Sequence, residues 1–173
     1  AMVTTGPGGT NAITGVAGAW LDSTPCLFLS GQVKLADRMY DSQGRHLGVR
    51  QMGAQEVDIV SLVKPITKYA VTIDDPCTIR YHLEKAVHLA QTGRPGPVWI
   101  DIPMDVQAAP IDESALAGFD APLPSLVSTS LKSQVSEVIA ALNRAQRPIL
   151  LAGNGIRLAG AENEFRALVD VLD

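Results

Sequence analysis

Residues 4–11 read Thr4-Thr5-Gly6-Pro7-Gly8-Gly9-Thr10-Asn11 and join a short apolar segment, residues 1–3, to a run of small and apolar residues, 12–21. The pattern predicts the end of a buried strand followed by a helix. Glycines around a proline let the backbone bend sharply and approach a ligand closely, and we expect Thr10 or Asn11 to cap the helix. The stretch is therefore either a loop that receives a phosphate or cofactor, or a tight turn whose glycines serve packing alone.

The residues that follow alternate between strand and helix patterns. Continuous apolar runs at residues 25–30 and 97–102 are typical of strands covered on both faces of a parallel sheet. Residues 68–73 alternate like a third strand, and helical spacing of apolar residues predicts helices over 55–63 and 79–90. The order strand, helix, strand predicts an α/β fold, in which a parallel sheet is flanked by helices.

Composition argues against several classes of function. The chain has 14 basic and 18 acidic residues and a net charge of −4, so we expect no nucleic-acid partner. No apolar run reaches the length of a membrane span, so we expect no membrane partner. Cys26 and Cys77 lack the spacing of a metal-binding or redox motif and are predicted to be buried free thiols in a reducing compartment, the cytoplasm.

The C-terminal part changes in character. Residues 107–129 contain prolines, glycine and serines that break any periodicity, and are predicted to be a linker. An amphipathic helix is expected over residues 130–145, a buried strand over 148–152 and a second helix after it. One strand and two apolar helix faces cannot bury themselves, so we expect more chain or a partner to cover them. The chain is accordingly expected to be a piece of a longer protein.

Several motifs resemble the thiamine-diphosphate enzymes of the acetolactate synthase type. In chain order they are Thr5-Gly6-Pro7-Gly8-Gly9-Thr10-Asn11, Ala19-Trp20-Leu21-Asp22-Ser23-Thr24-Pro25, Ser30-Gly31-Gln32, Gln55-Glu56-Val57-Asp58-Ile59, Lys64-Pro65-Ile66-Thr67-Lys68 and Gly93-Arg94-Pro95-Gly96-Pro97-Val98-Trp99-Ile100-Asp101-Ile102-Pro103. The resemblance covers roughly residues 1–111 and is weaker from about residue 130 on. It implies that residues 1–106 are the C-terminal part of the pyrimidine-binding domain of that thiamine-diphosphate-binding fold. Residues 107–129 would then be the linker, and 130–173 the truncated start of a Rossmann-like central domain.

The resemblance assigns roles to residues near the glycine-rich stretch. The residues that would contact the aminopyrimidine side of thiamine diphosphate are Gly6, Pro7, Gly8 and Asn11. Gln55 would be the polar catalytic residue on the substrate side. Glu56 is expected to make a structural bond at the start of a helix, where the helix dipole stabilises a carboxylate. The alternative for the glycine-rich stretch, residues 4–11, is again a turn that serves packing alone.

The implied cofactor is thiamine diphosphate with Mg²⁺. By resemblance, the glutamate that activates the cofactor lies ahead of Ala1 and the Mg²⁺-binding motif lies in a later domain, so we predict no metal site in this chain and no activity for it alone. The histidines show no ligand spacing. Some family members bind FAD; Gly153-Asn154-Gly155 with Gly160 is a poor match to a dinucleotide-binding fingerprint, so FAD stays an open alternative.

The polar, irregular residues 32–54 are expected to form a long loop, which is uncommon in a compact domain unless it is functional or mobile. This loop carries Arg45, His46, Arg50 and Gln51. These residues form either a lid that receives a carboxylate or phosphate of the substrate, or a solvated charged loop.

The resemblance implies that the intact protein decarboxylates a 2-keto acid such as pyruvate and passes the two-carbon unit to a carbonyl acceptor, as a homodimer or homotetramer. Ala54 stands where the family has a phenylalanine, and Met104 where it has a lysine. These departures favour a relative that uses a different acceptor. The alternatives are a glyoxylate carboligase-like or oxalyl-CoA decarboxylase-like enzyme, and a non-catalytic α/β interaction module.

Overall fold

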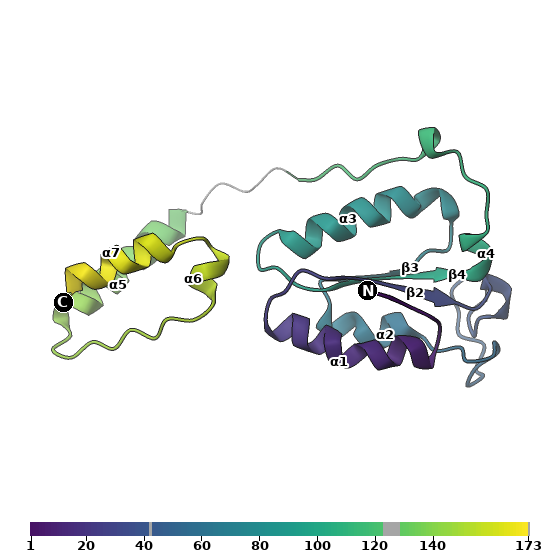
Figure 1. The fold of residues 1–173 in the computed structure, drawn as a ribbon, viewed down its shortest axis with the longest axis horizontal. Coiled ribbons are helices and arrows are strands. Elements are labelled where there is room, and N and C mark those ends of the chain that lie inside the picture. The colour runs from purple at the N-terminus through teal and green to yellow at the C-terminus, as the bar shows by residue number, and fades with distance from the viewer. Residues whose placement is uncertain (42, 123–128, 173) are drawn as a thin grey trace. The chain divides into compact units, whose positions relative to one another are not determined.

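The computed structural model describes residues 1–41, 43–122 and 129–172 of the chain (Figure 1). The chain forms two compact units, Ala1–Pro122 and Leu123–Asp173. The linker predicted over residues 107–129 spans this division, and its part at 123–128 lies outside the described residues. The predicted domain boundaries themselves stay a prediction.

The first unit is built on a four-stranded sheet. Its strands are β1 (Met2–Val3), β2 (Leu27–Gln32), β3 (Tyr69–Thr72) and β4 (Val98–Pro103), in the spatial order β1-β2-β4-β3. All three pairings are parallel, with Leu29 opposite both Met2 and Ile100. The α/β fold with a parallel sheet is therefore confirmed.

Helices cover both faces of this sheet. The helices α1 (Pro7–Leu21) and α2 (Ile59–Val63) lie on one face and α3 (Ile79–Gln91) on the other (Figure 1). The shorter elements are η1 (Leu35–Asp37), η2 (Lys64–Ile66), η3 (Pro76–Thr78), α4 (Met104–Gln107) and η4 (Glu113–Ala115).

Two apolar clusters fill the space between sheet and helices. On the α1 and α2 face the buried residues are Val16, Phe28, Ile59, Val63 and Trp99. On the α3 face they are Ile73, Ala86, Ala90, Val98, Ile100 and Val106. Phe28 and Trp99 stack with their ring centroids 5.3 Å apart. Successive residues of β4 thus enter opposite clusters, which is why this strand reads as a continuous apolar run.

The start of α1 differs from the prediction. The helix begins at Pro7 rather than at residue 12, so most of the glycine-rich stretch is helical. Gly6 is the N-cap, and no side chain caps the helix, so the capping expected of Thr10 or Asn11 is wrong. Proline at the first helical position explains the earlier start, because its fixed φ suits a helix and its missing N–H needs no partner there.

The start of α2 also lies later than predicted. The helix begins at Ile59 rather than at residue 55, and the Asp58 side chain accepts a hydrogen bond from the Ser61 N–H as its N-cap. Asp58 is a strong N-cap residue, so the chain ahead of it stays non-helical. Glu56 was expected to lie at the start of this helix, and that expectation is wrong.

The second unit contains α5 (Thr129–Arg144), α6 (Gly155–Leu158) and α7 (Glu162–Leu172). The strand predicted over residues 148–152 is wrong, because these residues are irregular. Ile149 is 92% exposed and Leu151 97% exposed. A strand needs a partner for its backbone groups, and none is formed among residues 129–172.

Two further expectations from the sequence can be compared with the structure. Cys26 is half-buried and Cys77 is exposed, and both are free thiols. The prediction that both are buried is wrong for Cys77, because it lies in the short surface turn η3. Within the described ranges, no helix combines the length and the apolar composition that a membrane crossing requires.

Candidate functional site

The glycine-rich stretch forms a corner between β1 and α1, at the edge of the sheet where the parallel strands end. Gly6 is buried there with φ +57°, a conformation that side chains disfavour. A Cβ atom on Gly6 would lie 2.1 Å from the backbone oxygen of Gln55. A Cβ atom on Gly8 would lie 2.5 Å from Cγ2 of Thr4. The corner is therefore packed closely on its own neighbours, as the packing alternative expects of these glycines.

Gln55 reaches this corner from the loop ahead of α2. The structure thus brings together Gly6 and Gln55, the two predicted site positions that are farthest apart in sequence. Gln55 is exposed and has φ +61°. Ser23 is the other non-glycine residue with positive φ in the described part of the chain. Such a backbone costs about 1–2 kcal/mol for a residue with a side chain, and strain of this kind is often found at functional sites.

The outer surface of the corner is open. Pro7 and Asn11 are exposed and Gly8 is partly exposed. The first turn of α1 has no acidic residue, so the protein does not neutralise the positive end of the helix dipole there. The Gly8 N–H already donates to the Thr5 carbonyl at 3.2 Å and the Thr10 N–H to the Gly6 carbonyl at 3.0 Å, and proline has no N–H. This surface therefore suits a flat ring that lies on Pro7 and Gly8 and bonds to the Asn11 amide. Pro7, Gly8 and Asn11 could hold such a group, with Gln55 beside it.

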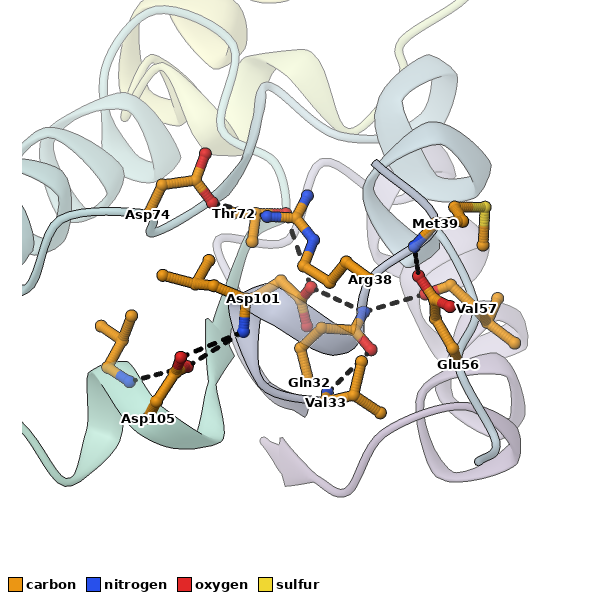
Figure 2. A network of polar contacts seen from close by, with 12 residues as sticks. Gln32, Val33, Arg38, Met39, Glu56, Val57, Thr72, Asp74, Asp101 and Asp105 are labelled. Atoms are coloured by element: carbon orange, nitrogen blue, oxygen red, sulfur yellow. Dashed lines mark hydrogen bonds and ion pairs between the residues drawn. The ribbon is translucent and has the colours of Figure 1, made fainter. Parts of the chain in front are cut away.

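Gln32, at the end of β2, ties the corner to the rest of the sheet edge (Figure 2). Its side-chain oxygen accepts hydrogen bonds from the Thr5 hydroxyl and from the Val33 N–H, each 3.0 Å long. Its side-chain nitrogen donates to the Val57 carbonyl at 2.9 Å and to Asp101 at 3.0 Å. One buried amide therefore connects the residue before Gly6, the loop that holds Gln55, and β4.

Asp101 is the buried carboxylate behind Gln32 (Figure 2). It accepts a hydrogen bond from the Ser30 hydroxyl, which itself accepts one from the Trp99 indole N–H at 2.8 Å. Burial raises the pKa of the Asp101 carboxyl to about 6, although hydrogen bonds from Ser30, Gln32 and Thr72 act in the opposite direction. Asp101 is only 1% exposed, so it can act on a ligand only through the side chains that donate to it, Ser30, Gln32 and Thr72.

Glu56 anchors the loop rather than a helix. Its carboxylate accepts hydrogen bonds from the backbone N–H groups of Met39 at 2.5 Å, Met52 at 2.8 Å and Gly53 at 3.2 Å. A carboxylate that is only 6% exposed and accepts several N–H groups holds the loop in one place. Its predicted structural role is therefore present, but at a different position from the helix start that was expected.

A cavity of about 740 Å³ lies at the same edge of the sheet, between the loop and α2. Charged groups along it are paired within the protein: Arg38 with Asp74 at 2.6 Å, and Arg45 with Asp41 at 2.8 Å. Asp58 accepts a hydrogen bond from the Tyr40 hydroxyl at 2.8 Å. This bond raises the pKa of Tyr40.

The side chains of the charged loop, predicted to form a lid or a solvated surface, are exposed or bonded within the loop. Arg50 and Gln51 are exposed, and the Nδ1 atom of His46 accepts a hydrogen bond from the Gly48 N–H. Arg45 is exposed as well, and its pairing with Asp41 stays inside the loop. Among the residues that the structure describes, no three His, Cys, Asp or Glu side chains lie close enough together to hold a metal ion.

Comparison with known proteins places this corner in a family. Residues 1–62 match the family described as thiamine pyrophosphate enzyme, N-terminal TPP binding domain. The chain is 37% identical over 169 residues to the acetolactate synthase large subunit of Lactococcus lactis. The aligned residues cover 98% of the chain and 28% of that protein. The chain belongs to the thiamine-diphosphate enzymes of the acetolactate synthase type.

Two other relatives show the range of the similarity. Acetolactate synthase isozyme 3 large subunit of Escherichia coli is 33% identical over 174 residues, covering 99% of the chain and 28% of the relative. Glyoxylate carboligase of Escherichia coli O157:H7 is 36% identical over 162 residues, covering 91% of the chain and 24% of the relative. The chain spans about a quarter of the length of the curated relatives it matches.

The thiamine-diphosphate family gives the predicted residues their context, although their individual roles stay predictions. Gly6, Gly8, Pro7, Asn11 and Gln55 all lie within the residues that match the family domain. The sequence reasoning assigned no role to Gln32 or Asp101. A usable signal was present, because a carboxylate inside an otherwise apolar strand needs hydrogen-bond donors around it, and the paired strand ends in Ser30-Gly31-Gln32.

Proposed function

We propose that this chain supplies the wall of a thiamine-diphosphate site that faces the aminopyrimidine ring. Gly6, Pro7, Gly8 and Asn11 would contact the ring, and Gln55 would lie on the substrate side. The observation that carries this proposal is the corner itself: Gly6 is fixed against the Gln55 backbone while Pro7 and Asn11 remain at the surface. When bound, thiamine diphosphate supplies a nucleophile and an electron sink.

This chain's own residues would position the cofactor rather than transform it. The exposed first turn of α1 would offer the Pro7 side chain and the Asn11 amide to the cofactor ring. Gln32 would hold Thr5 and the Gln55 loop at a fixed distance from each other through its four hydrogen bonds. Such pre-organisation matters because small displacements of binding groups weaken catalysis strongly.

We further propose that the intact protein decarboxylates a 2-keto acid such as pyruvate and passes the two-carbon unit to a carbonyl acceptor. The names of the acetolactate synthase relatives support this reaction. The similarity to glyoxylate carboligase supports a second candidate, in which glyoxylate is the substrate. Mg²⁺ bound outside this chain, a homodimer or homotetramer, and FAD as an optional cofactor belong to the same proposal.

The test is turnover by the intact protein supplied with thiamine diphosphate and Mg²⁺. Carbon dioxide release and product are measured with pyruvate, 2-ketobutyrate and glyoxylate. We expect turnover of at least one of these acids, and a loss of at least tenfold in Gln55→Ala and Asn11→Ala. Thr14→Ala, an exposed polar position on the same helix, is the matched control and should behave as the wild type. A protein that releases no carbon dioxide from any of the three acids would contradict the proposed reaction and favour the oxalyl-CoA decarboxylase-like enzyme or the interaction module. Carbon dioxide release from oxalyl-CoA separates these two.

The isolated 173-residue chain gives a second test. We expect calorimetry to show weak or no binding of thiamine diphosphate, because the residues proposed to bind the diphosphate and Mg²⁺ lie elsewhere. Tight, Mg²⁺-dependent binding by this chain would contradict the proposed division of the site.

A further inference from the structure

A second cavity lies at the opposite edge of the sheet from the Gly6 corner, where β3 and β4 begin. It has a volume of about 510 Å³ and is lined by residues from the end of α1, from the residue before β3 and from the turn between α3 and β4. The lining side chains include Trp20, Leu21, Lys68, Thr92, Arg94 and Pro95. The Gly6 corner and Gln55 contribute nothing to this cavity, so it is separate from the proposed cofactor site.

The cavity holds two cationic side chains and no acidic one. In the described residues, the ion pairs are Arg38–Asp74, Arg45–Asp41 and Arg80–Glu84, so neither Lys68 nor Arg94 has an acidic partner there. Burial lowers the pKa of the Lys68 amine. The cavity at the carboxyl edge differs, because its charged groups are paired within the protein. Lys68 is half-buried and Arg94 is exposed. A half-buried cation without an acidic partner, with a second cation at the same cavity, favours an anion there.

The guanidinium of Arg94 is held in place by the protein. Its Nε atom donates a 2.7 Å hydrogen bond to the Ser23 hydroxyl. Ser23 is 3% exposed and has φ +56° just beyond the end of α1. The bond to Ser23 uses one donor of the guanidinium and leaves the Nη groups for another partner. The Nζ atom of Lys68 donates to the Thr92 carbonyl at 2.5 Å, so it is fixed at the same rim.

An apolar surface lies beside these cations. Trp20 is 39% exposed and Leu21 is 73% exposed. Gly96 lets the Lys68 stem pack closely on the backbone, because a Cβ atom there would lie 3.2 Å from Lys68 Cδ. The Trp20 ring lies beside the same position, 3.9 Å from that Cβ at Cε3. An exposed indole next to fixed cations is suited to stack on a flat ring while the cations bind an attached anionic group.

We propose that this cavity binds a small organic anion with a planar apolar body, the ring against Trp20 and the anionic group between Lys68 and Arg94. A carboxylate and a phosphate ester share this chemistry, and the arms of the experiment distinguish them. The ligand differs in kind from the aliphatic 2-keto acid proposed as substrate. Failure of this site would leave the proposed function untouched, because the two sites share no residue.

The experiment uses the 173-residue chain and the fluorescence of its two tryptophans. Benzoate and phenyl phosphate are the two probes; inorganic phosphate and benzyl alcohol supply the anion without the ring and the ring without the anion. We expect at least one of the two probes to change the fluorescence saturably, and both half-probes to bind at least tenfold more weakly. Saturation by benzoate alone or by phenyl phosphate alone supports the site and identifies its anionic group.

Variants locate the binding. Trp20→Phe leaves only Trp99, which is fully buried, so the fluorescence change should disappear while calorimetry still detects binding. Arg94→Gln and Lys68→Met should each weaken the bound probe about tenfold. Arg80→Gln and Lys64→Met, exposed cations outside the cavity, are the matched controls and should bind as the wild type.

Saturable binding of neither benzoate nor phenyl phosphate, by fluorescence and by calorimetry, would overturn the proposal, and so would either of two further results. One is equal affinity for the probes and for benzyl alcohol, which would make the anionic group irrelevant. The other is unchanged affinity in both Arg94→Gln and Lys68→Met, with circular dichroism showing that both variants are folded. If one of the two fails to fold, the other and the Trp20→Phe comparison still decide.

Discussion

Ile100 and Asp101 are neighbours in β4, and both are almost fully buried, yet they belong to regions of opposite character. Ile100 lies in the apolar middle of the sheet, packed with Val98 and α3. Asp101 lies at the carboxyl edge, where Ser30 and Gln32 surround a buried carboxylate. The middle of the sheet gains stability from close packing. The carboxyl edge holds a buried carboxyl group and backbone with positive φ, both of which cost stability. Such features tend to occur at functional sites.

The same contrast appears in the backbone. At the carboxyl edge Gly6 and Gln55 both have positive φ, and their atoms are in close contact. The strands in the middle of the sheet contain no positive φ among the described residues. The comparison predicts that substitutions in the middle of the sheet will lower the free energy of unfolding strongly. Some substitutions at the carboxyl edge should raise it, because they remove a buried carboxyl group or a positive φ.

The largest effect is expected from Ile100→Ala. Ile100 is 0% exposed, so truncation leaves a cavity and should lower the free energy of unfolding by about 2–5 kcal/mol. Urea unfolding followed by tryptophan fluorescence measures this, because both tryptophans lie in the first unit. Ile111→Ala, in the same unit at a position 41% exposed, is the matched control and should lower the free energy much less. Similar costs at both positions would remove the contrast.

Asp101→Asn tests the neighbouring position through its pH dependence. The folded-state pKa is raised from 3.8 to about 6, so between these values the folded protein holds a proton that the unfolded chain has lost. The contribution of this group to stability is therefore greatest below pH 4 and falls by about 1.4 kcal/mol per pH unit up to pH 6, about 3 kcal/mol in all. Urea unfolding at pH 4, 5, 6 and 7 should show that the variant lacks this decline.

Asp58→Asn is the control of opposite sign. Burial alone would raise the pKa of Asp58, but hydrogen bonds from Ser61 and Tyr40 outweigh it and the pKa is lowered. Asp58 therefore contributes stability above the ordinary carboxyl pKa and loses it as the pH falls. Its variant should lose stability near neutral pH and show less decline on acidification. Parallel pH profiles for Asp101→Asn and the wild type would show that the edge carboxylate carries no cost.

Gly6→Ala is expected to have the next largest effect. Both the positive φ and the Gln55 oxygen 2.1 Å from the new Cβ oppose it, so the free energy of unfolding should fall by about 1–3 kcal/mol. Gly15→Ala is the matched control on α1, because nothing lies within 4 Å of its Cβ. Alanine there should raise the free energy by about 0.5–1 kcal/mol. A neutral Gly6→Ala would mean that the corner adapts easily and is not held against Gln55.

The sequence was sufficient where the physics is local or repetitive. Buried strands such as 97–102 and the helix at 79–90 follow from apolar spacing, which the structure confirms. The strand expected at 148–152 fails because strand formation depends on a partner, which the pattern of one segment cannot reveal. The motif resemblance located the Gly6 corner, but the bonds of Gln32 join residues from four segments of the chain. Only the folded arrangement brings Thr5, Val57 and Asp101 to one side chain.

Gln55→Gly tests whether the positive φ of an exposed residue at the carboxyl edge costs stability. Glycine relieves the positive φ, which costs about 1–2 kcal/mol, but adds entropy to the unfolded chain. The net result should be a gain of about 0.5–1 kcal/mol in the free energy of unfolding of this chain, whereas the same change in the intact protein should lower turnover, since Gln55 is proposed to face the substrate. Gln55→Asn keeps an amide and tolerates this backbone better than glutamine, so it should gain stability and keep more turnover. A loss of stability in Gln55→Gly would mean that the glutamine side chain supports the corner, and that strain at this position is not the reason the edge differs from the middle of the sheet.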